Sequence, residues 1–263
     1  MSYEHIVFEE SDGVAMLTLN RPLALNALCF EMLAEMNAAL DGIRDEGRTR
    51  ALLMTGAGRA FCSGADLVKG TGAGNTSAGF DAGRILETQL NPLIERLNVL
   101  PVPIVTAVHG AVVGAGCSIA LAADIVICAR SAYFMLAFTK AGLMPDSGAT
   151  WLLPRLVGRA RANAMMFLAE KVGAETALQW GLIHQMADDD ELLATARALA
   201  ASLARGPTRA FALLRQALSR SASSSLSDAL QLERSLQRQA GLTEDFAEGV
   251  AAFREKRSPR FQG

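Results

Sequence analysis

The segment from Ala111 to Ala129 constrains the fold more than any other part of this 263-residue chain. It is nearly all apolar and about as long as a helix that spans a bilayer. Asp124 and clusters of glycine and other small residues interrupt it. Such interruptions are typical of segments packed inside protein, because lipid cannot satisfy a charge. We therefore expect a buried helix that runs into a buried strand, and no membrane association.

A segment of this kind needs a large core around it, and the composition can supply one. Hydrophobic residues make up 51% of the chain and charged residues 20%, which excludes a disordered protein. The formal net charge of -2 provides no broad basic field, so nucleic-acid binding is not expected. The acidic residues 1–13 lack the basic and apolar regions of a signal peptide.

The cysteines and histidines do not form a metal-binding pattern. No two of the four cysteines form a CxxC pair, and the three histidines are far apart in sequence. We therefore expect no metal and no disulfide. Unpaired cysteines among small and apolar residues are typical of a reducing compartment, so we expect a cytoplasmic protein. The residues are Cys29, Cys62, Cys117, Cys128, His5, His109 and His184.

Strand-like and helix-like patterns alternate along the chain and predict an α/β fold. Short β-type runs are expected at residues 6–9, 14–20, 51–55, 104–108 and 125–129. Helices are expected over residues 26–45 and 84–97, and residues 145–148 should open another. From Ala174 onward the pattern is mostly helical, with breaks at Gly206-Pro207 and Gly241. The last four helices are amphipathic, which suits packing against the core or another subunit.

Three glycine-containing segments each place backbone amides at a turn that enters a helix. They read GRAFCSGADL (residues 58–67), GAVVGAGC (110–117) and GLMPDSG (142–148). No P-loop, GxGxxG turn or GxSxG elbow is present, so nucleotide-cofactor and serine-hydrolase functions are not favoured. Together with Asn20-Arg21-Pro22 and Asn26-Ala27-Leu28, these segments resemble the crotonase (enoyl-CoA hydratase/isomerase) superfamily, in order and spacing, over nearly the whole chain.

The resemblance implies a fold and an assembly. The fold would be the crotonase (ClpP-like) spiral of repeated ββα units, with residues 1–200 as the core that holds the CoA-ester site. Residues 201–263 would be a C-terminal helical trimerisation region, and the chain would form a homotrimer or a dimer of trimers. The substrate would be an acyl-CoA thioester. No separate cofactor would be needed, because coenzyme A arrives as part of the substrate.

The same resemblance assigns catalytic roles to two backbone amides. Removal of a proton α to a thioester places negative charge on the carbonyl oxygen, and two N–H groups in a dry pocket can stabilise that charge by several kcal/mol. By resemblance these donors are the amides of Ala65 and Ala115. Small residues suit such sites because the backbone must approach the substrate closely. Taken alone, each would be an ordinary small residue in a tight turn.

The side-chain chemistry departs from the hydratase pattern of the family. Hydratases use two glutamates to activate water, and by alignment Ser118 and Phe138 occupy those positions here. Asp146 is the remaining carboxylate, and in an apolar pocket its pKa would rise, as suits a shuttling base. The alternative is that Asp146 caps the helix after Pro145. One shuttling carboxylate is sufficient to move a double bond.

We therefore expect an acyl-CoA isomerase that shifts a double bond, or opens a ring epoxide, through a thioenolate. Residues 137–155 and the C-terminal tail resemble the branch of the family that includes the epoxyphenylacetyl-CoA isomerase of phenylacetate degradation. The alternatives are an enoyl-CoA hydratase of fatty-acid or aromatic degradation and a dehalogenase with Asp146 as nucleophile. From another class, the chain could be a catalytically vestigial CoA-ester or RNA-binding relative.

Contacts with coenzyme A follow from the resemblance as well. Residues around the first glycine motif are expected to line the adenine and pantetheine path, and two on the last helix to reach the CoA of a neighbouring subunit. The glycine-rich stretch from Gly70 to Gly83 is expected to form a wall of the acyl pocket. The expected contact residues are Ala24, Ser63, Asp66, Leu67, Gly114, Gly116, Phe253 and Lys256.

Four further polar or reactive residues near these motifs are expected to be structural. Asp124 follows a small-residue helix and should stabilise the start of a strand. His109 precedes the second turn, where it could face the ligand, but a hydrogen-bonded buried histidine is the favoured interpretation. Cys62 and Cys117 flank the two amide turns and should fill space as small apolar groups.

Overall fold

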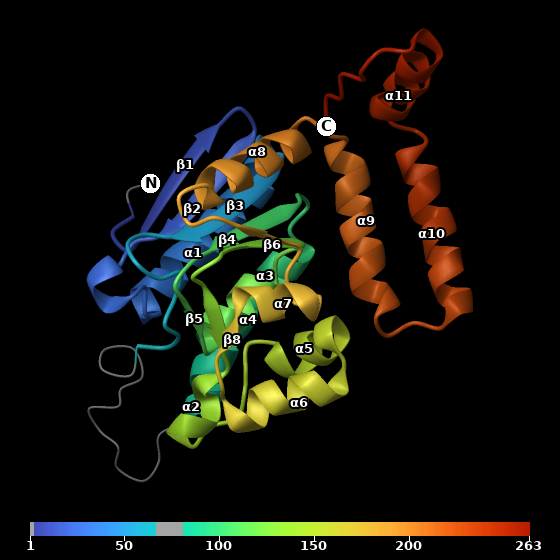
Figure 1. The fold of residues 1–263 in the computed structure, drawn as a ribbon. Helices are drawn as coiled ribbons and strands as arrows, with labels where there is room; N and C mark the ends of the chain where they lie inside the picture. Colours follow the sequence, from blue (N-terminus) through green and yellow to red (C-terminus); the bar gives the residue numbers. More distant parts are fainter. Residues whose placement is uncertain (1–2, 67–80) are drawn as a thin grey trace.

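The computed structural model describes residues 3–66 and 81–263, and within them it confirms the predicted α/β class. Helices and strands alternate through the first two thirds of the chain, and helices follow (Figure 1). The strands are β1 (Ile6–Ser11), β2 (Val14–Leu19), β3 (Ala51–Gly56), β4 (Ile104–Val108), β5 (Ala111–Val113), β6 (Ile125–Ala129), β7 (Tyr133–Met135), β8 (Val172–Gly173) and β9 (Gln185–Ala187).

The α-helices differ widely in length, and the longest ones lie near the two ends of the chain. They are α1 (Phe30–Glu46), α2 (Ala82–Ile85), α3 (Asn91–Val99), α4 (Ala115–Leu121), α5 (Ala149–Val157), α6 (Arg159–Leu168), α7 (Ala174–Gln179), α8 (Leu192–Ala204), α9 (Thr208–Ser221), α10 (Leu226–Ala240) and α11 (Glu244–Glu255). A π-helical turn (Leu86–Leu90) joins α2 to α3, and 3₁₀ turns cover Pro22–Ala24 and Ala137–Ala141.

The strands form two sheets. The larger has the order β1-β2-β3-β4-β6-β9, and only its β1–β2 pair is antiparallel. The smaller has the order β5-β7-β8. All residues of β4 are buried, as expected for a central strand of a parallel sheet covered on both faces. Helix α8 crosses β3, β4 and β6, as Figure 1 shows.

The apolar segment from Ala111 to Ala129 lies at the centre of the core. It forms β5, α4 and β6, and every residue of α4 is buried. This confirms the expected buried helix that runs into a buried strand. None of the helices in the described residues has the length and apolarity needed to cross a membrane.

The secondary structure differs from the prediction in the start of α1 and in an additional strand, besides the π turn that interrupts the helix expected over residues 84–97. Helix α1 begins at Phe30 and not at Asn26, because the Asn26 side chain is occupied elsewhere. Its Oδ1 accepts from Arg21 N (2.8 Å), and its Nδ2 donates to Ala57 O (2.9 Å) and Ala60 O (2.8 Å). The second difference is β9, which pairs with β6 inside a region expected to be mostly helical. Three residues are too few to give an alternating pattern.

The last three helices leave the sheet and form a separate layer. Helices α9 and α10 run side by side, and α11 lies beyond them, far from α2 (Figure 1). Arg215 on α9 anchors this layer to the core and is 8% exposed. Its Nε donates to both Asp124 carboxylate oxygens (2.9 and 2.8 Å), and its Nη atoms donate to Leu97 O and Leu100 O.

Substitution Arg215→Met is expected to destabilise the protein by about 3 kcal/mol, because it leaves two buried carbonyls without their donor and the Asp124 carboxylate without its cation. Chemical denaturation would measure the change. The control is Arg209→Met on the same helix, where the guanidinium reaches only the exposed Gln239 Oε1 at 3.4 Å. That change is expected to stay within about 0.5 kcal/mol. Equal losses in the two variants would contradict the anchoring role.

Candidate active site

Two glycine turns approach each other closely at the centre of the candidate site. Gly64 has φ +98° and Gly114 has φ +55°, conformations that favour glycine. A Cβ on Gly64 would lie 3.1 Å from Val113 O, and a Cβ on Gly114 would lie 3.7 Å from the Gly64 Cα. Backbone bonds between Cys62 and the neighbouring β5 strand hold the turns in this arrangement.

The residue after each glycine presents a backbone amide with no backbone acceptor among the described residues. Leu28 N donates to Gly64 O (2.8 Å) and Asp66 N donates to Leu28 O (2.9 Å), so the Ala65 N–H does not take part in this bridge. Ala115 is the first residue of α4, where an amide has no partner within the helix. Both predicted amides therefore belong to turns that leave them available.

A cavity of about 150 Å³ lies beside these turns. Both turns contribute to its lining through Ser63, Gly64, Ala65, Val113, Gly114 and Ala115. Apolar side chains from two further segments line it as well: Ala82, Ile85, Leu86, Leu90, Ala137, Phe138, Ala141 and Leu143. Asp146 is the one titratable side chain among the described lining residues. The cavity thus combines two amides, an apolar wall and one carboxyl.

Asp146 sits in the loop between the 3₁₀ turn and α5 and is half-buried. Burial raises the pKa of its carboxyl above the ordinary value, and a hydrogen bond from Ser147 Oγ to Oδ1 (2.8 Å) opposes the rise. The capping alternative is wrong, because α5 begins at Ala149 with Gly148 in the cap position and no side-chain cap bond. The carboxyl is therefore not engaged by the helix.

The positions that carry glutamates in hydratases, by the resemblance, are both close to Asp146. Ser118 is buried on α4, and its Oγ donates to Asp146 O at 3.1 Å. Phe138 lines the cavity and is 9% exposed. The serine therefore holds the backbone of the Asp146 loop, and the phenylalanine adds apolar surface. Neither supplies a carboxylate.

The structure brings together some of the expected coenzyme A contacts. Ser63 and Gly114 line the cavity, and Ala24 adjoins them because its carbonyl accepts from Ser63 Oγ at 3.5 Å. Gly116 is not among the lining residues. A Cβ there would lie 2.6 Å from the Cys62 side chain, so this glycine lets α4 pack on the first turn.

Other expected contacts lie away from the cavity lining. Asp66 is buried and forms an ion pair with Arg21 at 2.8 Å, an interaction that the sequence analysis did not anticipate. Phe253 and Lys256 are exposed at the end of α11, a helix that lies far from α2 (Figure 1). Leu67 lies outside the described residues, as does most of the Gly70–Gly83 stretch, of which Ala82 lines the cavity.

The structural roles expected for Asp124 and the two cysteines are confirmed. Asp124 Oδ2 accepts from Ile104 N (2.7 Å) at the start of β4. Burial raises the pKa of the Cys62 and Cys117 thiols to about 12, and Cys62 Sγ also donates to Asn26 O (3.1 Å) and accepts from Gly64 N (3.4 Å). His109 is only partly buried, contrary to expectation, and its Nε2 lies 2.9 Å from Gly58 O. Its partner is a carbonyl outside the cavity lining.

Sequence reasoning missed the apolar wall formed by Ile85, Leu86 and Leu90. These residues come from the π-helical turn and the short helix before it, which the sequence pattern merged into one helix over residues 84–97. Hydrophobic spacing does not distinguish a π turn from an α-helix. Among the described residues, no cluster of three or more His, Cys, Asp or Glu side chains could hold a metal ion.

Comparisons with known proteins show the family to which the chain belongs. The family model described as enoyl-CoA hydratase/isomerase matches residues 9–263. A protein of Rhodobacter capsulatus named "Probable enoyl-CoA hydratase" is 49% identical over the full length of both chains. The 1,2-epoxyphenylacetyl-CoA isomerase of Escherichia coli is 46% identical over 99% of each chain.

Solved structures of the family confirm the crotonase fold. The crystal structure of an enoyl-CoA hydratase from Bacillus anthracis superposes with a TM-score of 0.91 at 31% sequence identity. The match covers 99% of this chain and 100% of the other. The predicted spiral with a C-terminal helical region is therefore correct.

The raised pKa of Asp146 predicts a pH-dependent effect of Asp146→Asn on stability. Below the unfolded pKa of about 3.9 the carboxyl is neutral in both states. As the pH rises through the folded pKa, the folded protein must ionise a half-buried group and loses stability, whereas asparagine stays neutral. The melting temperature of the variant relative to wild type is therefore expected to increase from pH 4 to pH 7.

Asp189→Asn provides a control of opposite sign in the same measurement. Hydrogen bonds from the Ser131 hydroxyl and amide hold the pKa of Asp189 below its ordinary value. Its replacement is therefore expected to cost stability toward neutral pH and to have less effect in acid. A melting-temperature difference for Asp146→Asn that is flat or falls with pH would contradict the environment described for this carboxyl.

Proposed function

We propose that this chain, which belongs to the enoyl-CoA hydratase/isomerase family, is an acyl-CoA isomerase that works through a thioenolate. The observation that carries the proposal is the cavity that places one titratable side chain, Asp146, beside two available backbone amides. A single carboxyl can remove a proton from one carbon and return it to another. Hydration needs a water-activating group as well, and the described lining residues offer no second carboxylate.

In the proposed reaction the thioester carbonyl oxygen lies between the amides of Ala65 and Ala115. The Asp146 carboxylate removes a proton from C2 of a 3-enoyl-CoA, and the electron pair moves onto the carbonyl oxygen. The two N–H groups stabilise the resulting oxyanion, and the positive end of α4 adds to the effect. The protonated Asp146 then returns the proton to C4, which yields the 2-enoyl thioester. No external oxidant or reductant takes part.

The substrate is proposed to carry an apolar acyl group. Ile85, Leu86, Phe138 and Leu143 offer hydrocarbon surface, and the described lining contains no cation to pair with an acyl carboxylate. The 46% identical relative from Escherichia coli is named for 1,2-epoxyphenylacetyl-CoA, an aromatic-derived ester. Opening of a ring epoxide in phenylacetate catabolism is therefore one specific form of the proposed activity.

Enoyl-CoA hydratase is the second candidate, because the 49% identical relative bears that name. The arrangement around Ser118 and Phe138 argues against it. The Ser118 hydroxyl donates to the Asp146 carbonyl, and Phe138 contributes a ring where a carboxylate would be needed. A hydratase would have to activate water with Asp146 and a group outside the described lining.

We also propose a homotrimer or dimer of trimers, with α9–α11 as the interface region. Leu214, Leu218, Leu226 and Leu230 are exposed apolar residues on α9 and α10. Phe253 is 86% exposed on α11, is not among the described residues that line the cavity, and its helix lies far from α2 in Figure 1. Phe253 and Lys256 are therefore proposed to contact the coenzyme A bound by a neighbouring subunit.

The decisive experiment follows a 3-enoyl-CoA and a 2-enoyl-CoA with the purified protein in deuterated water by proton NMR. Double-bond migration with deuterium at C2 or C4, and without a 3-hydroxy product, is expected. Asp146→Asn is expected to lower turnover by at least about 100-fold, because the shuttling base is lost, while CoA-ester binding is retained. Rapid formation of 3-hydroxyacyl-CoA, or full turnover by the variant, would overturn the assignment.

Gly114→Ala tests the role of the second amide turn. The backbone conformation of Gly114 (φ +55°, ψ -129°) is unfavourable for alanine, so the turn must shift in the variant. The Ala115 N–H then moves with it. Turnover is expected to fall about 100-fold, the order lost with one oxyanion donor.

Gly47→Ala is the matched control for this substitution. Gly47 also has positive φ (+64°), it has open space around its Cβ position, and it ends α1. A loss of stability of about 1 kcal/mol with unchanged turnover is expected there, because the αL conformation of Gly47 is less unfavourable for alanine than the conformation of Gly114. A Gly114→Ala variant with wild-type turnover would contradict the oxyanion role of this turn.

A further inference from the structure

The wall of the acyl cavity contains a rare element, a π-helical turn, and this turn is contacted by residues that do not line the cavity. Leu86 and Leu90 line the cavity and belong to the π-helical turn between α2 and α3. The turn closes with a bond from Asn91 N to Leu86 O, one residue longer than in an α-helix. π-helical turns are rare in proteins, but those that occur are often found at functional sites.

The sequence explains why regular helix fails at this point. Pro92 has no N–H and cannot donate to Thr88 O, the acceptor that an α-helix would use. The polypeptide therefore leaves the α-helical pattern just before Pro92.

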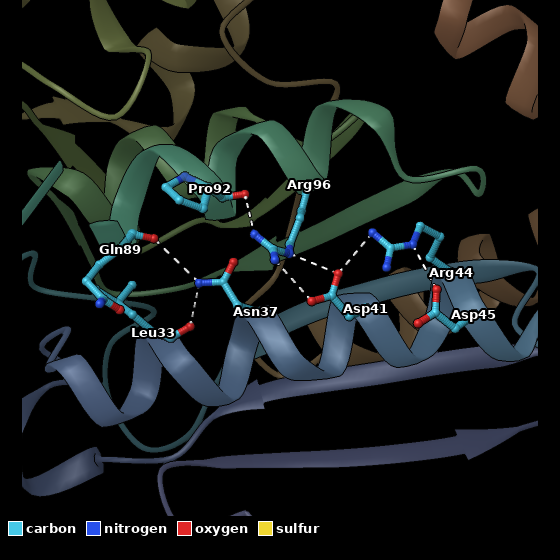
Figure 2. Close-up of polar contacts among 8 residues, drawn as sticks. All are labelled: Leu33, Asn37, Asp41, Arg44, Asp45, Gln89, Pro92 and Arg96. Atoms are coloured by element: carbon cyan, nitrogen blue, oxygen red, sulfur yellow. Dashed lines mark hydrogen bonds and ion pairs between the residues drawn. The ribbon is translucent and has the colours of Figure 1, made fainter. Parts of the chain in front are cut away.

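Side chains of α1 and α3 bond to carbonyls on either side of this break, as Figure 2 shows. Asn37 Nδ2 donates to Gln89 O in a long bond of 3.5 Å, and to Leu33 O at 2.9 Å on its own helix. Arg96 Nη1 donates to Pro92 O at 3.3 Å. Both acceptors lie at the end of the π turn or just beyond it.

Arg96 is itself fixed on α1 by a bidentate ion pair. Its Nε lies 3.0 Å from Asp41 Oδ1 and its Nη2 lies 3.1 Å from Asp41 Oδ2. The two parallel bonds define the orientation of the guanidinium, which a single contact would not. The group formed by Asn37, Asp41 and Arg96 is called the α1–α3 seam below.

Within the part of the chain that the structure describes, one polar atom of the α1–α3 seam lacks the hydrogen bond that a buried polar atom usually has. Asn37 Oδ1 is buried and has no hydrogen-bond partner among the described residues. A buried acceptor left unpaired is unfavourable, and such atoms in folded proteins call for an explanation. Here the amide is turned so that its N–H₂ group can reach two carbonyls, one of them on the π turn.

We propose that Asn37, Asp41 and Arg96 are positioning residues that hold the π-helical turn in place and thereby set the acyl-chain selectivity of the cavity. None of the three lines the cavity, so they act through Leu86 and Leu90. The inference rests on the proposed function, because it assumes that the cavity receives the acyl group of a CoA ester. The inference assigns acyl-chain selectivity to the α1–α3 seam, whereas the proton transfer remains with Asp146.

Binding of saturated acyl-CoAs tests the inference without any reaction. Dissociation constants of butyryl-CoA and octanoyl-CoA would be measured by calorimetry for wild type, Arg96→Gln and Asp41→Asn. Both variants are expected to change the ratio of the two constants about fivefold, less than the tenfold or more that one methylene group can contribute in a well-packed pocket. Seam residues are half-exposed, so both variants are expected to fold.

Arg44→Gln is the matched control. Arg44 contacts Asp41 Oδ1 at 3.1 Å and Asp45 at 2.9 Å, both on its own helix, so among the described residues it belongs to the same network but does not link α1 to α3. Its removal is expected to leave the ratio unchanged. An equal change with Arg44→Gln, or a uniform loss of affinity for both esters in the seam variants, would overturn the inference.

A double-mutant cycle with Leu86→Ala then locates the effect. If the seam acts through this side chain, the change in selectivity caused by Arg96→Gln is expected to shrink in the Leu86→Ala background. Full additivity would overturn the proposed route. A wild-type chain that binds neither ester would overturn the proposed function itself, whereas binding of both with an unchanged ratio in the seam variants would overturn this inference alone.

Discussion

The arrangement of the site depends on the close approach of two backbone turns at Gly64 and Gly114. Neither turn tolerates a side chain well: one glycine faces a carbonyl at close range, and both have positive φ. Gly116 must also lack a side chain, because a Cβ there would collide with Cys62. Once these contacts form, the start of α4 and the end of the first turn are fixed relative to each other. Two amides then converge on one cavity without any flexible side chain, and such preorganised dipoles need little reorganisation when charge develops.

The environment of Asp146 gives this cavity a simple acid–base character. Its pKa is raised mainly by burial, and the described lining contains no second carboxylate to repel it. One group titrating alone has a single pKa, in contrast to a coupled pair, whose protons belong to both groups. Ser118 completes the arrangement, because it binds the backbone of the Asp146 loop and leaves the carboxyl to face the cavity. By the resemblance, hydratases carry a catalytic glutamate at the position of Ser118. Here the serine instead supports the loop that carries Asp146.

The sequence predicted the elements whose signals are local and strong. Strands β3, β4 and β6 are compact apolar runs, and the second and third glycine segments predicted the turns that precede α4 and α5. The sequence could not reveal where side chains bind across the fold. Asn26 looked like the start of a helix, but its amide joins three backbone groups and delays α1 to Phe30. The π turn, the Arg21–Asp66 pair and the anchor at Arg215 likewise depend on contacts between segments distant in sequence. Spacing rules do not report such contacts.

The C-terminal layer is held more firmly than its separation from the sheet suggests. Arg215 fixes α9, and the tail closes the far end: Asp245 accepts from Gln262 N (2.6 Å), and Arg50 at the edge of β3 donates to Phe261 O (3.1 Å). Helix α11 is therefore connected to the core at its tail as well as through α10. Rigid surfaces lose less conformational entropy on association than mobile ones. The exposed apolar residues of α9 and α10 and the end of α11 are thus presented in a fixed geometry, which the assembly proposed here requires if Phe253 is to reach a neighbouring cavity.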